Sequence, residues 1–249
     1  MRKIDMRAGI AMIELIFAIV VMGIVLMSAP MLISTATKSG YVALQQEAIA
    51  AASSEIGMIL TLHWDGQAVG QDMDAPILST AGDTDLNETL DGAGNPTIGT
   101  RAGTPASSQR SFLTALGGRR SATATTDFGT TPGDDMDDID DFSGGSSTLT
   151  AVSSASMGEG DYIDQDINIL TTVSYINDTP TGGSYAGSSS TITLNNPFNR
   201  GAGAGATSNI KLVNIRLTTD NTSPELNKTI ILNAFTCNIG TYELKERTF

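Results

Sequence analysis

The sequence predicts an α+β fold in which one long N-terminal helix packs on a C-terminal antiparallel β-sheet. Two patterns predict this fold. From residue 10 to residue 62 the chain is typical of a helix, apolar on all sides in its first half and amphipathic in its second half. Beyond residue 160, apolar and polar residues alternate with the period of two that marks strands with one buried face. The 249 residues are enough for one sheet-based core.

The first half of the helix has the length and composition of a membrane span. No charged residue occurs from 15 to 33, and a helix over residues 10–33 would be about 36 Å long, enough to cross a hydrocarbon core of about 30 Å. Basic residues exceed acidic ones just before the span: Arg2, Lys3 and Arg7 against Asp5. Because such an excess keeps its flank cytoplasmic, we expect one membrane pass with the C-terminal part exported.

One carboxylate, Glu14, lies inside the apolar run. A charged side chain near the middle of a bilayer costs about 2.5 kcal/mol or more, so Glu14 is expected to be functional and to need a partner. An ordinary secretory signal peptide has a shorter apolar region followed by a small-residue cleavage site. Here the run is longer, and Pro30 blocks conventional cleavage after Met27-Ser28-Ala29. Neither a signal peptide nor a plain signal anchor accounts for Glu14.

The segment Gly9-Ile10-Ala11-Met12-Ile13-Glu14-Leu15-Ile16 resembles the N-terminal signature of type IV prepilins and of type II secretion pseudopilins. The resemblance covers about the first thirty residues, with Ile10 where the family commonly has phenylalanine. It implies a pilin-like fold and cleavage after Gly9 by a prepilin peptidase, followed by methylation of the new N-terminus at Ile10. It also implies that Glu14 pairs with the terminal amine of a neighbouring subunit during filament assembly.

The resemblance also implies partners and a location. The partners are other pilin subunits, the prepilin peptidase/N-methyltransferase and an inner-membrane assembly platform. The subunit would cross the inner membrane once with its head in the periplasm, and would then enter a pilus or pseudopilus.

The expected organisation has a leader, two helix halves and an exported head. The amphipathic half carries apolar residues at helical spacing: Val42, Ile49, Ala52, Ile56 and Ile59. The expected bounds are 1–9 for the leader, 10–33 for the transmembrane and assembly half, 34–62 for the amphipathic half, and 63–249 for the head, with long loops over 66–160 and a sheet over 161–238.

The head is expected to contain an antiparallel sheet of about four strands, over residues 161–177, 191–194, 209–219 and 229–238. In the first of these strands the predicted buried residues are Ile163, Ile167, Ile169, Val173 and Tyr175. In the third they are Val213, Ile215 and Leu217. Within the loop region, residues 112–116 form at best a short helix that ends at Gly117-Gly118.

Composition argues against several functions. The net charge of −13 argues against nucleic-acid binding, because phosphate contacts need clustered Lys and Arg. Cys237 is the single cysteine, so no intrachain disulfide can form, and we expect a small buried side chain there. His63, the sole histidine, is expected to cap and pack together with Trp64. No nucleophile motif or paired-cysteine metal motif accompanies it, so no enzymatic activity and no bound cofactor are expected.

An acidic segment from residue 134 to residue 142 has six carboxylates in nine residues: Asp134, Asp135, Asp137, Asp138, Asp140 and Asp141. Three interpretations stay open. A solvated acidic loop is favoured; a calcium site is the second, because Ca²⁺ takes six to eight oxygen ligands; contact with a basic partner is the third. Residues 137–142 also resemble an acidic motif of minor pilins of the mannose-sensitive haemagglutinin type, which implies a minor subunit.

Three functions follow from these observations. The first is a structural, minor subunit of a type IV pilus-like filament, polymerised through its N-terminal helix. The second is a pseudopilin of a type II secretion system. The third, from another class, is a membrane-anchored exported binding protein or hydrolase, against which the scarcity of histidine and the missing nucleophile motif argue.

Overall fold

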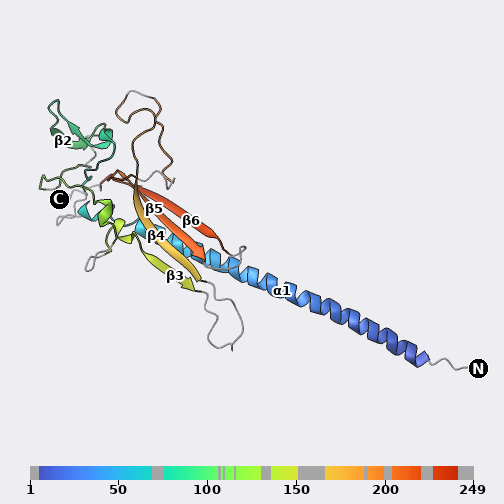
Figure 1. Ribbon diagram of the computed structural model, residues 1–249. Helices are drawn as coiled ribbons and strands as arrows, with labels where there is room; N and C mark the ends of the chain where they lie inside the picture. Colours follow the sequence, from blue (N-terminus) through green and yellow to red (C-terminus); the bar gives the residue numbers. More distant parts are fainter. Residues whose placement is uncertain are drawn as a thin grey trace, which may run out of the picture. The chain divides into compact units, whose positions relative to one another are not determined.

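The computed structural model describes residues 6–68, 76–105, 108, 110–114, 116–129, 136–150, 166–187, 190–198, 204–219 and 227–240. In this part of the chain one long helix, α1 (Met6–Ile59), precedes a set of antiparallel strands, so the fold is α+β as expected (Figure 1). The chain divides into two compact units, residues 1–47 and 48–249.

In the first unit, α1 is a continuous helix with apolar side chains on every side. All the large apolar residues from Met12 to Ile33 are exposed, and the helix is long and apolar enough to cross a membrane. Pro30 lies inside the helix without ending it. The hydroxyls on either side of Pro30 bond to the helix backbone, Ser28 to the Val25 carbonyl and Thr35 to the Met31 carbonyl. These polar side chains are thus satisfied within the helix, as a span in lipid requires.

In the second unit, the last part of α1 buries a face that differs from the predicted stripe. Ala52 and Ile59 are buried and Ile56 is half-buried as expected, but Ile49 is exposed, and Val42 in the first unit is exposed too. Ala48 is buried instead. The prediction weighted large side chains, whereas alanines let a helix backbone approach its neighbour closely.

The helix ends at Ile59, three residues earlier than predicted. The amide of Thr61 bonds to the Met58 carbonyl and the amide of Leu62 to the Ile59 carbonyl. These bonds span three residues rather than four, so the chain tightens into a turn after Ile59.

The main sheet has four antiparallel strands in the order β3-β4-β5-β6: β3 (Ser146–Thr150), β4 (Asp166–Ile176), β5 (Ile210–Thr219) and β6 (Thr229–Cys237). The predicted strands over 161–177, 209–219 and 229–238 are therefore confirmed where they are described. Ile163 lies outside the described residues. In the β4–β5 pair, Val173 lies opposite Val213 and Tyr175 lies opposite Lys211.

Three elements of the head were predicted wrongly. β3 lies where a loop was expected: it is an edge strand with a single large apolar side chain, so it lacks the alternation that reveals a strand. A second sheet, β1 (Glu88–Leu90) paired with β2 (Pro96–Arg101), also falls in the expected loop region. The expected strand over 191–194 makes only one isolated bridge, between Thr193 and Gly182.

Short 3₁₀ turns complete the described head: η1 (Gly66–Ala68), η2 (Thr84–Leu86), η3 (Thr125–Asp127) and η4 (Asp140–Phe142). The described residues of 112–116 form no helix. Phe112 is instead buried, and its amide bonds to the Gly99 carbonyl. Tertiary contacts to β2 therefore override the local helical tendency of this segment.

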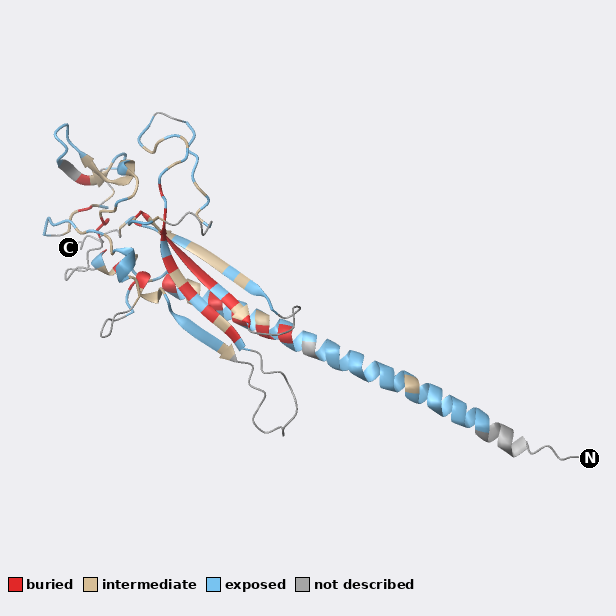
Figure 2. Ribbon diagram, in the orientation of Figure 1, coloured by how far each residue is buried: buried red, intermediate tan, exposed pale blue. Residues whose placement is uncertain are grey.

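A hydrophobic cluster joins the end of α1 to the sheet. Ile59 of α1, Val173 of β4, Val213 of β5 and Ile139 pack together, with Leu62, Phe128 and Phe142 at the margin. Figure 2 shows buried residues along β4, β5 and the adjoining part of α1. Because Ile139 belongs to this cluster, the acidic segment around it is tied to the core.

Cys237 is exposed, in contrast to the expected buried side chain. It is the last residue of β6, an edge strand in which exposed and half-buried residues alternate. The sequence predicted that Cys237 lies in a strand over 229–238, but it gave no sign that this strand forms an edge of the sheet.

Candidate functional site

The N-terminal segment places its predicted residues on one helix. Gly9 and Ile10 lie in the first turns of α1, and the side chain of Ile10 lies outside the described set. Glu14 lies one turn further on and is exposed. No ion pair to Glu14 occurs among the residues that the structure describes. The first unit therefore presents an apolar helix surface with one carboxylate near its start.

The acidic segment is only partly solvated, contrary to the favoured interpretation. Asp134 and Asp135 lie outside the described residues. Asp137 is exposed and Asp141 is half-buried, but Asp138 and Asp140 are buried with 4% and 3% of their surface accessible. Two carboxylates of this highly acidic segment are thus buried in the head.

Backbone amides satisfy two of these carboxylates. Asp138 accepts hydrogen bonds from the amides of Gly66, Asp140 (2.8 Å) and Asp141 (3.2 Å). Asp141 accepts from the amides of Asp137 (3.1 Å) and Asp138 (3.2 Å). The dense acidic pattern therefore builds a turn that starts η4 and ties it to η1, which is a structural use of the charges.

Lys211 supplies the positive charge at the centre of this region. Its side chain is completely buried, and Nζ donates to the Trp64 carbonyl (2.7 Å), to Asp65 Oδ2 (3.0 Å) and to Asp140 Oδ1. Three aromatic rings surround the ammonium, with centroids at 4.3, 5.3 and 5.6 Å from Nζ: Trp64, Phe128 and Tyr175. We call Lys211, Asp65, Asp138, Asp140 and these three rings the Lys211 cluster.

Asp65 is held in place by four donors. Oδ1 accepts from the Gln67 amide (3.0 Å) and the Thr123 hydroxyl (2.8 Å), and Oδ2 accepts from the Thr123 amide (2.9 Å) and Lys211 Nζ. Tyr175 in turn donates its hydroxyl to the Thr123 carbonyl (2.8 Å). Thr123, which orients the Asp65 carboxylate, is therefore tied to β4, the strand that pairs with β5 and its Lys211.

Burial changes the acidity of this cluster. Burial raises the pKa of Asp140 to about 7, although the Lys211 charge acts in the opposite direction. Burial also raises the pKa of Asp138. The pKa of the Tyr175 phenol is raised by burial and by the negative charge of Asp65. The site therefore contains a carboxyl group that is largely protonated below neutral pH beside a buried amine.

The stability of the head is expected to fall as the pH rises from about 4 to about 7. The ordinary pKa of Asp140 is 3.8, so in this window the folded chain holds a proton that the unfolded chain has lost. The stabilisation is complete below pH 4, is lost as the pH rises through 7, and amounts to a few kcal/mol. Urea midpoints followed by the fluorescence of Trp64 measure it. An Asp140→Asn chain should show a flatter profile; an equally steep one would contradict this assignment.

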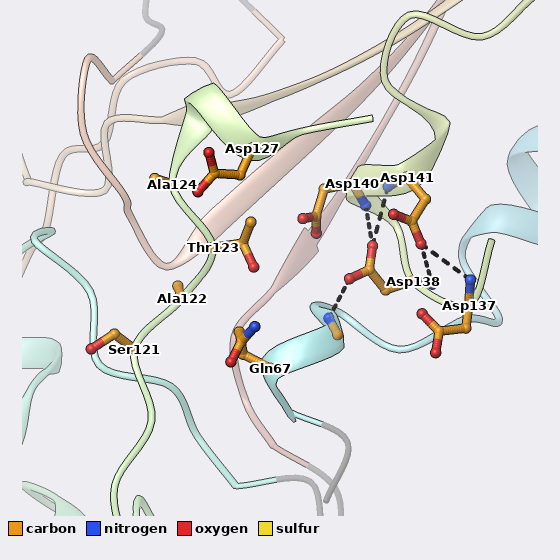
Figure 3. Close-up of a pocket in the computed structure, with 11 residues that line it drawn as sticks. Gln67, Ser121, Ala122, Thr123, Ala124, Asp127, Asp137, Asp138, Asp140 and Asp141 are labelled. Atoms are coloured by element: carbon orange, nitrogen blue, oxygen red, sulfur yellow. Dashed lines mark hydrogen bonds between the residues drawn. The ribbon is translucent and has the colours of Figure 1, made fainter. Parts of the chain in front are cut away.

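A pocket of about 630 Å³ lies beside the cluster. Figure 3 shows the carboxylates of Asp138, Asp140 and Asp141 grouped at one side of it. Its other lining residues are Gly66, Gln67, Ser121, Ala122, Thr123, Ala124, Asp127 and Asp137. The lining is mostly polar, so the pocket is suited to water and small polar groups.

Two groups of carboxylates are close enough to share an ion. Single oxygens of Asp65, Asp138 and Asp140, and likewise of Asp137, Asp138 and Asp141, lie within 4.8 Å of one another. In the first group the ammonium of Lys211 already contacts both Asp65 and Asp140. In the second, Asp138 and Asp141 already bind backbone amides. A calcium ion at the acidic segment stays a prediction from sequence.

Sequence reasoning missed Asp65 and Lys211. The signal for Lys211 is its position in β5, two residues before Val213 and in phase with the core-facing residues Ile215 and Leu217. Asp65 carries no such signal beyond following Trp64. Of the expected His63 and Trp64 pair, Trp64 packs in the cluster, whereas His63 is exposed and contributes its carbonyl to the Ile139 amide (3.1 Å).

Comparison of the chain with protein-family models, with curated proteins and with solved structures finds no match.

Proposed function

We propose that this chain is a structural, minor subunit of a type IV pilus-like filament that polymerises through α1. The observation that carries the proposal is an exposed helix surface over residues 12–33 that is apolar except for Ser28 and the single carboxylate Glu14. An α+β head with a four-stranded sheet after such a helix supports it. The prepilin-like segment around Gly9 supports cleavage after Gly9 by a prepilin peptidase as the processing step.

The physical reason for assembly lies in the two environments of α1. In the inner membrane, lipid covers the apolar side chains and the head faces the periplasm. In the filament, the helices of neighbouring subunits replace the lipid. Glu14 would then be buried, and an unpaired buried charge is strongly unfavourable. The N-terminal amine of a neighbouring subunit, freed by cleavage before Ile10, is the partner that we propose.

Processing is the most direct test of this proposal. We expect the mature chain to begin at a methylated Ile10, because the peptidase cleaves after Gly9 and methylates the new amine. Intact mass and N-terminal peptide mass measure both changes. A Gly9→Val chain, with the same span and the same charges, should keep its first nine residues. Wild-type protein that retains these residues in its working location would overturn the proposal.

A further inference from the structure

The Lys211 cluster holds an amine, a carboxyl group and a second carboxylate in direct contact within the protein. Lys211 Nζ touches Asp140 Oδ1 and lies 3.0 Å from Asp65 Oδ2. Lys211 and Asp65 are fully buried, and Asp140 is 3% exposed. A simple ion pair would need one carboxylate for one ammonium. Here two carboxyl groups contact the same nitrogen.

We propose that the folded head forms an intramolecular amide bond between Lys211 Nζ and Asp140 Cγ, with loss of one water molecule. Nucleophile and electrophile are neighbours in the fold although they lie 71 residues apart in sequence. The inference concerns the head alone and does not depend on the proposed filament function.

The surroundings exclude water from the nucleophile and favour the uncharged form of the electrophile, Asp140. The rings of Trp64, Phe128 and Tyr175 enclose Nζ at centroid distances of 4.3 to 5.6 Å and keep water from it. Burial raises the pKa of Asp140, so its carboxyl group is populated in the protonated form that an amine can attack. Proton transfer from the ammonium to Asp65 provides the neutral amine, and reactants held in contact need no further ordering.

The proposed reaction balances without an oxidant or any other reactant. Asp65 takes a proton from Nζ; the Nζ lone pair then attacks Asp140 Cγ and the C–N bond forms. One Cγ–O bond breaks, and the oxygen leaves as water. The three ammonium hydrogens and the acid hydrogen of Asp140 end as one amide hydrogen, two hydrogens of water and one on Asp65. The total charge of the three groups stays at zero, and no charge remains buried on them.

The fold provides both a position for the proton carrier and an exit for water. Asp65 is oriented by the Thr123 amide and hydroxyl, and one of its oxygens lies within 4.8 Å of an Asp140 oxygen, so it can carry protons between the reacting groups. Asp140 also lines the polar pocket of about 630 Å³. The water released at Cγ therefore leaves into a polar space and not into the aromatic enclosure.

The proposed amide bond would cross-link a head in which no intrachain disulfide can form. Cys237 is the single cysteine of the chain. An amide from β5 to η4 would close a loop of about 71 residues and restrict the unfolded chain as a disulfide does. The fall in stability with rising pH that we predict from Asp140 therefore applies only to chains in which the amide bond has not formed.

Mass spectrometry of the full chain in detergent tests the proposal. We expect the folded protein to be lighter by about 18 Da than its unlinked sequence, the mass of one water. Trypsin cuts after Lys and Arg, so the product should be a branched peptide that joins residues 121–200 to residues 201–216, uncut at Lys211. Chain that is recovered in urea without having folded should have the mass of the unlinked sequence. The same chain should lose one water after refolding.

Three variants should abolish the mass deficit of about 18 Da. Lys211→Arg keeps the positive charge without the attacking amine. Asp140→Ala removes the electrophile and is preferred to asparagine, whose amide could also be attacked. Asp65→Asn retains both reactants but removes the proton acceptor. Lys228→Arg, at an exposed lysine, is the matched control and should keep the deficit.

Two results would overturn the proposal, and neither requires a variant to fold. The first is folded wild-type protein of full mass that is cut at Lys211. The second is a deficit of about 18 Da mapped to a linear peptide, as a succinimide at Asp65-Gly66 would produce. Persistence of the branched peptide in Asp65→Asn would overturn the role of Asp65.

Discussion

Lys211→Met is expected to lower the stability of the head by about 3–5 kcal/mol, which is the effect of removing one partner from a buried charge pair. The reason is that, in a chain that has not formed the proposed amide bond, Asp65 and Asp140 would remain buried without the ammonium that contacts both. Methionine retains the length and apolar stem of lysine, so the change isolates the charge. Trp64, the single tryptophan, packs against Lys211 and reports unfolding in urea by its fluorescence.

The control for this prediction is Lys228→Met, an exposed lysine whose replacement should change the urea midpoint little. A triple variant, Lys211→Met with Asp65→Asn and Asp140→Asn, should recover part of the lost stability, because it leaves no unpaired charge in the core. An unchanged midpoint in Lys211→Met would mean that the cluster contributes nothing to folding. If the single variant does not accumulate, folding of the triple variant still measures the charge effect.

Glu14→Ala is expected to leave cleavage after Gly9 and membrane insertion unchanged and to reduce incorporation into filaments by at least about tenfold. Each factor of ten corresponds to about 1.4 kcal/mol, and loss of one partner of a buried ion pair exceeds that value. The variant also removes the one charge between residues 12 and 33, so insertion into lipid should not suffer. Sheared surface filaments, compared with the membrane fraction, measure incorporation.

Glu47→Ala is the matched control, because Glu47 is an exposed acid on the same helix but lies outside the apolar run. It should be processed and incorporated like the wild type. Normal incorporation of Glu14→Ala would contradict the proposed pairing of Glu14 with a neighbouring N-terminal amine. Recovery of the wild-type chain only from a periplasmic assembly would favour the pseudopilin function over a surface pilus.

The elements that could be predicted are those with strong internal periodicity. β4 alternates along most of its length, β5 has Val213, Ile215 and Leu217 at a spacing of two, and α1 is a long apolar helix, so each can be recognised without knowledge of its neighbours. β3 and the hairpin of β1 and β2 have few large apolar residues, and only their partners make them strands. Residues 191–194 show the reverse error, since apolar alternation without a full partner strand yields a single bridge.

The acidic segment shows where sequence reasoning ends. Its composition predicts solvated charge, yet Asp138 and Asp140 are buried, because Ile139 between them joins the hydrophobic core. Their partners are Gly66, which is 72 residues away from Asp138, and Lys211, which is 71 residues away from Asp140. No local pattern can show that a lysine 71 residues away contacts one of these carboxylates.

Sequence alone was enough to predict the α+β class, the membrane-capable helix with its single acid and three of the four main strands. The helix shows as a continuous apolar run and the strands as apolar residues at a spacing of two, so residues near one another in the sequence are enough to predict them. The Lys211 cluster depended on tertiary structure, because it unites the residues just before η1, the residue after η3, the start of η4, the end of β4 and the start of β5. Burial and pairing of charges are set by groups that meet only in the folded chain, and these decide which carboxylates are solvated and which can react.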